Sequence, residues 1–431
     1  MAGTPCESND KGTPEHYVQI DSERCNGCVL CMKACPTKAI RVRGGKARIE
    51  GICIDCGECL RVCPNRAIKA VTTGLDSKDL RPYTILLVSP VLYTQFGEGV
   101  MPNDILLALW KAFGYVFDLA YANEVFNAAT ELTIRQNRTT ARRKWPLISP
   151  ICPVVNRIIK YRFPSLLGHI LPVATPREFV ARALKKNLSE KGLFREEDSA
   201  VVHVTPCSAK MMSISSPLFF ESSNLDGVLG ITEIFETVRR NLGQEDQNIM
   251  LHWSSGVGIG WNMSGGEIAG LESGRYLAVS GIQETMSYLE KIEMGLLAGI
   301  EYVEFRACPE GCIGGPMTVA DKYQAKHTVQ RLRAMYGLEK RMTHEKIRQT
   351  YMEGLFFTDR DEPAPENGAG QASISSAIEK ERAVDRFLRI LPGKECGACG
   401  SPDCRTFAED VIDGRASPEE CVFSHQFKEK L

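Results

Sequence analysis

Short apolar runs alternate with amphipathic segments of helical length through the middle of the chain. Four apolar runs predict buried strands, at residues 84–88, 146–148, 200–204 and 302–305. Apolar positions recur with helical spacing at residues 104–113, 123–135 and 284–297. This alternation predicts an α/β domain over residues 81–355, with a mostly parallel sheet that helices cover on both faces.

The pattern changes on both sides of this domain. Residues 17–78 form two similar halves, each with a cysteine loop, a Cys-Pro step and a short aliphatic stretch, which indicates an internal duplication. Residues 356–377 are charged, rich in proline and glycine, and lack apolar periodicity, so we expect a flexible linker. A helix over residues 378–391 then opens a small, mainly helical C-terminal module at residues 378–428.

Composition and charge narrow the classes of function. The 431 residues suffice for about two to four domains. The formal net charge is −1, which gives no electrostatic case for a nucleic-acid partner. The N-terminal residues do not resemble a secretory signal, and no apolar run approaches the roughly 18 residues that cross a bilayer. We therefore expect a soluble, cytoplasmic protein with no membrane span.

Cysteine placement says most about the chemistry. Of the 17 cysteines, all except Cys6 fall into four groups of four. Two groups repeat the spacing C-x2-C-x2-C-x3-C-P, one is dispersed through the middle, and one closes the chain. In chain order the groups are Cys25, Cys28, Cys31 and Cys35; Cys53, Cys56, Cys59 and Cys63; Cys152, Cys207, Cys308 and Cys312; and Cys396, Cys399, Cys404 and Cys421. Thiolates are soft ligands that suit iron–sulfur clusters, so we predict four [4Fe–4S] clusters and redox chemistry.

Disulfides and zinc are the alternative uses of so many cysteines. Disulfide frameworks belong to small secreted domains, and nothing in the chain indicates secretion. Zinc also uses C-x2-C pairs and stays open as an alternative, more at the C-terminal group than at the tandem run. The tandem run is typical of iron–sulfur ligation.

The predicted strands indicate how the four dispersed cysteines can come together. Cys152, Cys207 and Cys308 each follow a predicted strand at once, each beside a proline, and Cys312 comes a turn later. Ligands gather at the carboxyl ends of strands in open α/β sheets, so these thiols are expected to converge at one sheet edge. Four buried structural cysteines are the alternative.

Two weaker signals are set aside. Gly256, Gly258 and Gly260 alternate without G-x-G-x-x-G spacing, which predicts a tight turn rather than a nucleotide site. The histidines are scattered and are expected to be structural, at His169, His203 and His252.

Two of the cysteine groups resemble known electron-transfer modules. The tandem run resembles the bacterial two-cluster ferredoxin domain, in which the fourth thiol of each run serves the other cluster. This resemblance implies one cluster on Cys25, Cys28, Cys31 and Cys63, and another on Cys53, Cys56, Cys59 and Cys35. The last group resembles the small [4Fe–4S] module of corrinoid iron–sulfur proteins and Rnf-type electron-transport subunits.

The central motifs resemble the catalytic domain of the [FeFe]-hydrogenases, whose H-cluster joins a [4Fe–4S] cubane to a diiron subsite. The match lies in residues 149–153 (S-P-I-C-P), 205–210 (T-P-C-S-A-K) and 304–316 (E-F-R-A-C-P-E-G-C-I-G-G-P). The resemblance implies that the four dispersed thiols hold the cubane and that Cys312 also bridges to the diiron unit. It further implies that Lys210 donates a hydrogen bond to a cyanide on that unit.

Departures from the family pattern shape the expected activity. Ile151 stands where active members carry a proton-passing thiol, and Ser213 replaces a relay glutamate. Arg306 replaces a methionine, and a glutamine is missing before Pro316. A positioned acid or base typically contributes roughly 10²–10⁴-fold, so slow catalysis is expected. This combination is similar to the sensory or regulatory branch of the family.

The resemblance implies a slow sensory or regulatory hydrogenase, 2 H⁺ + 2 e⁻ ⇌ H₂, that exchanges electrons through its [4Fe–4S] clusters. A ferredoxin or other redox protein is the expected partner, with a signalling or hydrogenase subunit as a further one. One alternative is a non-catalytic electron-transfer subunit that holds clusters without the diiron site. Another is an iron–sulfur assembly scaffold, against which the ferredoxin repeat and the C-terminal module argue.

Overall fold

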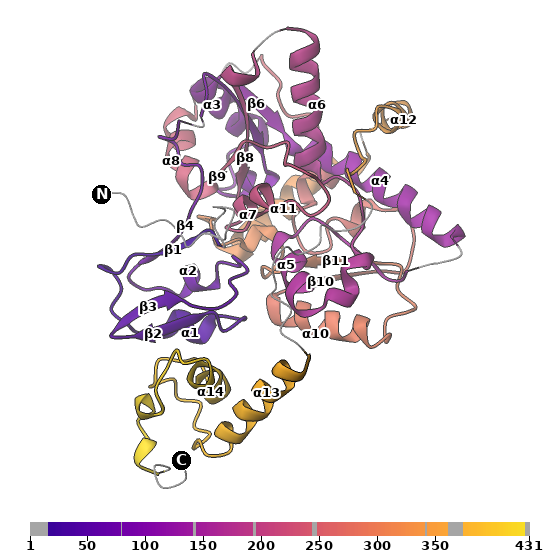
Figure 1. Cartoon of the computed structure of the whole chain (residues 1–431). Helices are drawn as coiled ribbons and strands as arrows, with labels where there is room; N and C mark the ends of the chain where they lie inside the picture. The colour runs from indigo at the N-terminus through magenta and orange to yellow at the C-terminus, as the bar shows by residue number, and fades with distance from the viewer. Residues whose placement is uncertain are drawn as a thin grey trace. The chain divides into compact units, whose positions relative to one another are not determined.

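The structure is a computed structural model that describes residues 16–426, except residue 79 and segments 141–143, 193–194, 244–247, 341–342 and 361–373. The chain folds as two compact units, one formed by Met1–Ala70 with Pro365–Leu431 and the other by Val71–Ala364 (Figure 1). Cys6, most of the predicted linker at 356–377 and the last residues of the predicted module lie outside the described residues.

The N-terminal part of the first unit is a repeat of short strands and helices. Its elements are β1 (Val18–Ile20), α1 (Leu30–Ala34), β2 (Ile40–Arg43), β3 (Lys46–Ile49), α2 (Glu58–Val62) and β4 (Ile68–Ala70). Strand β1 pairs antiparallel with β4, and β2 pairs antiparallel with β3. Left-handed backbone recurs at equivalent positions of the two halves, namely Gly27 and Asp55, Val29 and Gly57, and Lys38 and Arg66. The halves therefore share their loop geometry as well as their cysteine spacing.

The C-terminal part of the first unit contains α13 (Ile374–Leu388) and α14 (Cys404–Ile412). Helix α13 begins and ends a few residues earlier than the sequence predicted, because Leu391 packs into the core from the turn that follows. Val384, Phe387 and Phe407 complete this small core, which is separate from the core of the ferredoxin-like repeat.

The second unit is α/β, and its strands form two parallel sheets instead of the single sheet that was predicted. A four-stranded sheet has the order β6-β5-β8-β9, and a three-stranded sheet has the order β10-β11-β7. The strands are β5 (Tyr83–Val88), β6 (Tyr115–Asp118), β7 (Leu147–Ile148), β8 (Ser199–Thr205), β9 (Gly227–Gly230), β10 (Tyr276–Ser280) and β11 (Tyr302–Arg306). All four predicted strands are present, and β6, β9 and β10 were not predicted.

Helices pack against both sheets, and Figure 1 shows α3 and α8 beside the four-stranded one. The helices are α3 (Pro102–Phe113), α4 (Leu119–Thr139), α5 (Pro153–Arg162), α6 (Pro176–Glu190), α7 (Lys210–Ser215), α8 (Ile231–Asn241), α9 (Gly256–Gly260), α10 (Ile282–Glu293), α11 (Lys322–Tyr336) and α12 (His344–Met352). Leu86, Val202 and Ile234 lie in the core between the strands and these helices.

The glycine cluster forms the short helix α9, whereas the sequence predicted a tight turn. A Cβ at Gly258 would lie 2.1 Å from the carbonyl oxygen of Ala120, so the missing side chain lets α9 pack closely against α4. Among the described helices, none combines the length and the apolar character that a bilayer crossing needs.

Candidate iron–sulfur centres

Two cavities in the ferredoxin-like repeat are each lined by four cysteines. One, of about 320 Å³, is lined by Cys25, Cys28, Cys31 and Cys63. The other, of about 330 Å³, is lined by Cys35, Cys53, Cys56 and Cys59. The fourth thiol of each run therefore faces the cavity of the other run, which is the crossed arrangement that the resemblance implies.

Backbone amides donate to the sulfurs that line these cavities. The Ala39 amide donates to Cys35 Sγ at 3.2 Å, and the Ala67 amide donates to Cys63 Sγ at 3.3 Å, at equivalent positions of the repeat. Burial raises the pKa of the Cys31 thiol to about 11, so a bare thiolate there is unfavourable. Four soft sulfurs with amide donors around a cavity fit a [4Fe–4S] cluster, which supplies the missing positive charge.

The C-terminal module holds a third cavity of about 330 Å³. Its four cysteines are Cys396, Cys399, Cys404 and Cys421. Cys404 opens α14, and burial raises the pKa of the Cys399 thiol. The similar volume and the same donor set fit the same kind of group as the cavities of the ferredoxin-like repeat.

The four central cysteines follow strands of both parallel sheets. Cys152 follows β7 and precedes α5, Cys207 follows β8, and Cys308 and Cys312 follow β11. The expectation of a single sheet edge was wrong, because β7 and β11 belong to one sheet and β8 to the other. Burial raises the pKa of Cys207 to about 12. The Lys210 charge opposes this shift, and the Cys152 and Cys312 thiolates add to it. These three thiols therefore lie close enough to repel one another when ionised.

Two buried cations accompany these thiols. Lys210 Nζ donates to the carbonyl oxygen of Ile151 at 3.2 Å. Arg177 Nη2 donates to Ser213 Oγ at 3.4 Å, and Arg177 Nε has no hydrogen-bond partner within the described residues. Burial lowers the pKa of Arg177, and the Glu178 carboxylate opposes this shift most, followed by the Cys207, Cys152 and Cys312 thiolates. Burial and the Arg177 charge lower the pKa of Lys210 to about 8, and the same three thiolates oppose that shift.

These cations test whether the central site suits an anionic iron–sulfur group. Buried positive charges with neutral hydrogen-bond partners are unfavourable unless an anion compensates them. Four thiolates around an iron–sulfur group would provide that anion, so the residues fit. The sequence reasoning missed Arg177. One signal existed, because Arg177 is the second residue of α6, where the helix dipole disfavours a cation.

Arg306, which departs from the family pattern, has carboxylate partners of its own. Its Nη2 donates to Glu267 Oε2 at 2.6 Å, and its guanidinium lies 5.0 Å from the centre of the Trp261 ring. The Ser149 and Tyr302 hydroxyls also donate to Glu267. The charge of Arg306 is therefore balanced within the scaffold by a carboxylate that bonds to it directly.

An open cavity of about 850 Å³ borders this centre between α5 and the end of α7. Pro150, Pro153 and Ser213 line it, as do three residues with a buried polar atom that lacks a partner within the described residues. Those atoms are Asn156 Oδ1, Thr175 Oγ1 and Arg177 Nε. Pro150 and Pro153 bring this cavity close to Ile151, whose side chain is buried and only 4% exposed.

The three scattered histidines bond to the scaffold. The Nδ1 atom of each lies within hydrogen-bond distance of an oxygen: 2.9 Å from Pro146 O for His169, 3.1 Å from Leu87 O for His203, and 2.7 Å from Asp118 Oδ2 for His252. Burial lowers the pKa of His203, so its ring is neutral.

The fold and the cysteine-lined cavities define an iron–sulfur redox protein with a parallel α/β domain. The family model "Iron only hydrogenase large subunit, C-terminal domain" matches residues 83–266 and 244–316. The chain belongs to this family. A 4Fe-4S dicluster domain model matches residues 17–73, and a model for an iron–sulfur cluster domain matches residues 391–423.

Solved structures agree on the fold. Two variants of the [FeFe]-hydrogenase HydA1 from Chlamydomonas reinhardtii align with TM-scores of 0.50 at 15% and 16% identity, over 66% of this chain and 95% of theirs. Curated relatives include a subunit of the ion-translocating oxidoreductase complex of Azoarcus sp., 36% identical over 52 residues (12% of this chain, 28% of the relative). The corresponding protein of Vibrio cholerae is 45% identical over 47 residues (11% and 24%), so the chain spans about a quarter of these relatives.

Proposed function

We propose that the chain is a slow sensory or regulatory [FeFe]-hydrogenase that interconverts 2 H⁺ + 2 e⁻ and H₂. The observation that carries this proposal is the placement of Arg177 and Lys210 beside Cys152, Cys207 and Cys312. The Glu178 carboxylate offsets part of the Arg177 charge, and the positive charge that remains beside the thiols suits a site with a large negative charge.

The proposed ligands follow the four cysteine groups. Three peripheral [4Fe–4S] clusters use the thiols of the three cavities described above, and Cys152, Cys207, Cys308 and Cys312 hold the central cubane. Cys312 would also bind the diiron subsite. When bound, these groups supply one-electron transfer and, at the diiron subsite, the metal that reacts with hydrogen.

The residues around the subsite explain the low expected rate. The Lys210 ammonium is buried and oriented by the Ile151 carbonyl, so it is placed to donate to an anionic ligand. The Ile151 side chain neither donates nor accepts a proton. The Ser213 hydroxyl donates to the Lys210 carbonyl oxygen at 2.7 Å, so in this conformation it is engaged within α7. Proton delivery therefore lacks a positioned acid at both positions.

A second candidate is an electron-transfer subunit that carries the cubanes without the diiron subsite. Two observations favour it: the apolar Ile151 next to the site, and the electron-transport relatives that match part of the chain. In both cases the proposed partner is a ferredoxin or a similar cytoplasmic redox protein.

Infrared spectroscopy separates the two candidates. The protein is produced with the hydrogenase maturation proteins and examined for bands of iron-bound CO and cyanide. Such bands, with about eighteen iron atoms per chain, support the hydrogenase. No bands in protein with about sixteen iron atoms would exclude the diiron subsite and leave electron transfer.

A further inference from the structure

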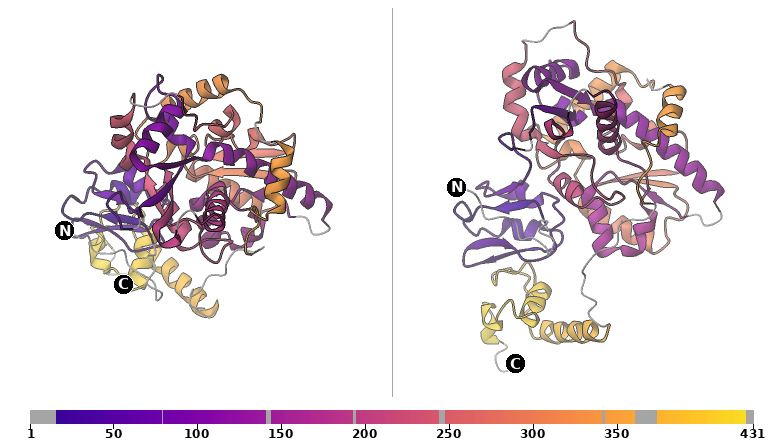
Figure 2. Two further views of the ribbon diagram at one scale, coloured as in Figure 1. Left: turned by 90° about the horizontal axis from the view of Figure 1, so that it is seen from above. Right: turned by 45° about the horizontal axis from the view of Figure 1, so that its top comes forward.

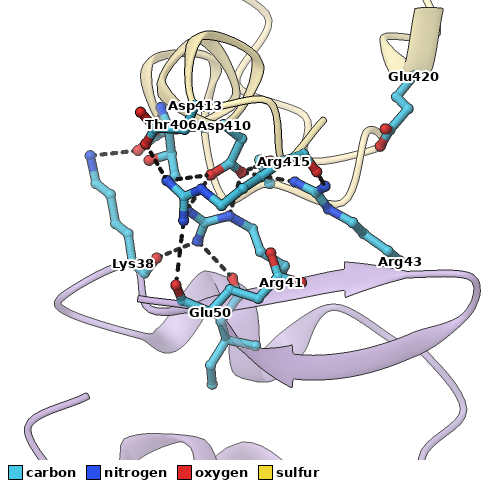
Figure 3. Close-up of polar contacts among 12 residues, drawn as sticks. Lys38, Arg41, Arg43, Glu50, Thr406, Asp410, Asp413, Arg415 and Glu420 are labelled. Atoms are coloured by element: carbon cyan, nitrogen blue, oxygen red, sulfur yellow. Dashed lines mark hydrogen bonds and ion pairs between the residues drawn. The ribbon is translucent and has the colours of Figure 1, made fainter. Parts of the chain in front are cut away.

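The ferredoxin-like repeat carries four cations on the side that meets the C-terminal module. Lys33, Lys38, Arg41 and Arg43 come from α1, β2 and the loop between them, and we call them the cationic face. The module meets this face with two carboxylates, Asp403 and Asp410, and with backbone carbonyls (Figure 3). The right-hand view of Figure 2 shows the yellow module next to the indigo repeat, and the Val42 amide of β2 bonds to the Gly400 carbonyl oxygen of the module. The two surfaces are complementary in charge.

Asp410 is the centre of this contact, and its side chain is fully buried. Arg41 binds it with two bonds, Nε to Oδ2 at 2.5 Å and Nη2 to Oδ1 at 3.0 Å. Arg43 adds a bond of 2.9 Å, and the module's own Ser401 adds one of 2.8 Å. Burial would raise the pKa of Asp410, but the bonds from Arg41 and Ser401 outweigh it and hold the pKa below its usual value. Asp410 is therefore an ionised anchor whose guanidinium partners include two from the other domain.

Further bonds surround the anchor. Lys38 pairs with Asp403 at 2.6 Å, and Lys33 donates to the carbonyl oxygens of Glu395 and Pro402 at 2.7 Å and 2.6 Å. They define one orientation of the module on the face, although exposed pairs of this kind contribute little energy individually.

A backbone hydrogen bond also fixes the geometry of the contact. The Val42 amide in β2 donates to the Gly400 carbonyl oxygen at 2.9 Å. A Cβ at Gly400 would lie 2.2 Å from the Val42 carbonyl oxygen, so only glycine permits this approach. The Gly400 backbone is also left-handed, with φ of 83°.

We propose that the C-terminal module is a resident partner of the ferredoxin-like domain, held on the cationic face by Asp410 independently of its covalent connection. Each partner has its own apolar core and the contact between them is polar, as in a complex of two proteins. The occupied face is then closed to a separate redox protein, so an external partner must bind elsewhere, for example on the module itself.

Docking of the module also brings two cysteine-containing segments together, which matters for electron exchange between their centres. A Cβ at Gly397, next to Cys396, would lie 3.0 Å from Met32 Cε, and Met32 is next to Cys31. The loop that carries Cys396 therefore lies against α1, which carries Cys31, and these two cysteines line different cavities. A module displaced from the face would lose this contact.

Cleavage of the connection tests the proposal. A protease site is inserted within residues 361–373 of the full chain, which is then cut and passed over a sizing column without oxygen at physiological ionic strength. We expect the cut protein to elute as one species. Asp410→Asn should release the module, because it removes the charge that compensates Arg41. Asp413→Asn is the matched control, since the partners of Asp413 among the described residues are Lys380 and Arg415, both in the module itself.

Hydrogen exchange of the intact chain provides a second measurement. The Val42 amide should exchange on the order of a hundredfold faster in Asp410→Asn, because breaking a buried ion pair shifts such equilibria by that order. If the Asp410→Asn protein loses iron, Arg41→Gln serves instead, because it removes the same ion pair from the ferredoxin-like domain. Release of the module from the cut but unsubstituted chain would overturn the proposal. Retention in Asp410→Asn and Arg41→Gln, as in Asp413→Asn, would overturn it equally.

Discussion

The cysteine cavities of the first unit and the central thiols of the second are built in different ways. In the ferredoxin-like repeat, eight thiols lie within 39 consecutive positions, from Cys25 to Cys63, and backbone amides donate to their sulfurs. The central thiols come from three strand ends in two sheets and have buried side-chain cations beside them. Local chain geometry stabilises the first kind of centre, and long-range side-chain charge stabilises the second.

This difference predicts different sensitivity to substitution. Amide donors belong to the backbone and survive most side-chain changes. The charges of Arg177 and Lys210 are lost with a single substitution each. The central site is therefore the one whose redox properties the chain can tune by a few residues, and the one that a few residues can disable.

Loss of one thiol should give the largest effect and separate the two regions. Cys207→Ala should remove the central cluster, abolish any hydrogen turnover and destabilise the second unit, because Arg177 and Lys210 then lack their anion. Cys59→Ala should remove one ferredoxin-type cluster and leave the melting of the second unit unchanged. Iron analysis should show a loss of about four atoms in Cys59→Ala and of about six in Cys207→Ala, or about four there if no diiron subsite is present, and calorimetry checks the stability. Equal destabilisation of the second unit by both variants would contradict the comparison.

The same difference explains what could be predicted from the sequence. The resemblance of the tandem run to a two-cluster ferredoxin domain grouped the eight N-terminal cysteines as the cavities do, and the motif is recognisable because its loops are local. The strands before Cys152, Cys207 and Cys308 were also predicted, because their apolar runs are strong. Their division between two sheets, and the burial of Arg177, depend on tertiary packing that periodicity does not encode.

The docking of the C-terminal module was missed for a related reason. Arg41 and Asp410 are 369 positions apart, and each looks like an ordinary surface charge in its own segment. The module was expected to follow a flexible linker, and most of that linker lies outside the described residues. The acidic residues of the module meet the cations of α1 and β2 only in the folded chain.

Restoring proton relay groups should give the next largest effect, and only at the central site. Ile151→Cys with Ser213→Glu should raise hydrogen turnover by roughly 10²-fold, because each adds a group that can carry a proton. A carboxylate at position 213 would lie beside Arg177, because Arg177 already donates a hydrogen bond to Ser213. Hydrogen evolution from a chemical reductant measures the gain, and Ile151→Val is the control that keeps the side chain apolar. If hydrogen turnover does not rise in a variant that shows intact diiron infrared bands, proton delivery at these two positions does not limit the rate.

Neutralising a buried cation should have a smaller effect, again confined to the central cluster. Arg177→Gln and Lys210→Gln should each lower its midpoint potential by on the order of 60 mV, which is tenfold in a one-electron equilibrium. The sign follows because a nearby positive charge favours the more negative, reduced state. Redox titration followed by electron paramagnetic resonance measures the shift. Arg239→Gln, which removes an exposed cation of α8, should leave all potentials unchanged. If Arg177→Gln or Lys210→Gln shifted the midpoint potentials of the ferredoxin-type clusters by a similar amount, the proposed difference between the two regions would be wrong.

The smallest expected effect concerns the contact between the two parts of the first unit. Gly400 and Gly414 both have left-handed backbone, with φ of 83° and 71°, so alanine at either position is strained by about 1–2 kcal/mol. A Cβ at Gly414 has nothing within 4 Å, whereas one at Gly400 would lie 2.2 Å from the Val42 carbonyl oxygen. Gly400→Ala should therefore lower stability more than Gly414→Ala, and only Gly400→Ala should speed exchange of the Val42 amide. Iron analysis guards against cluster loss, because Gly400 follows Cys399. Equal effects of the two variants on Val42 exchange would mean that the approach of Gly400 to β2 does not hold the module in place.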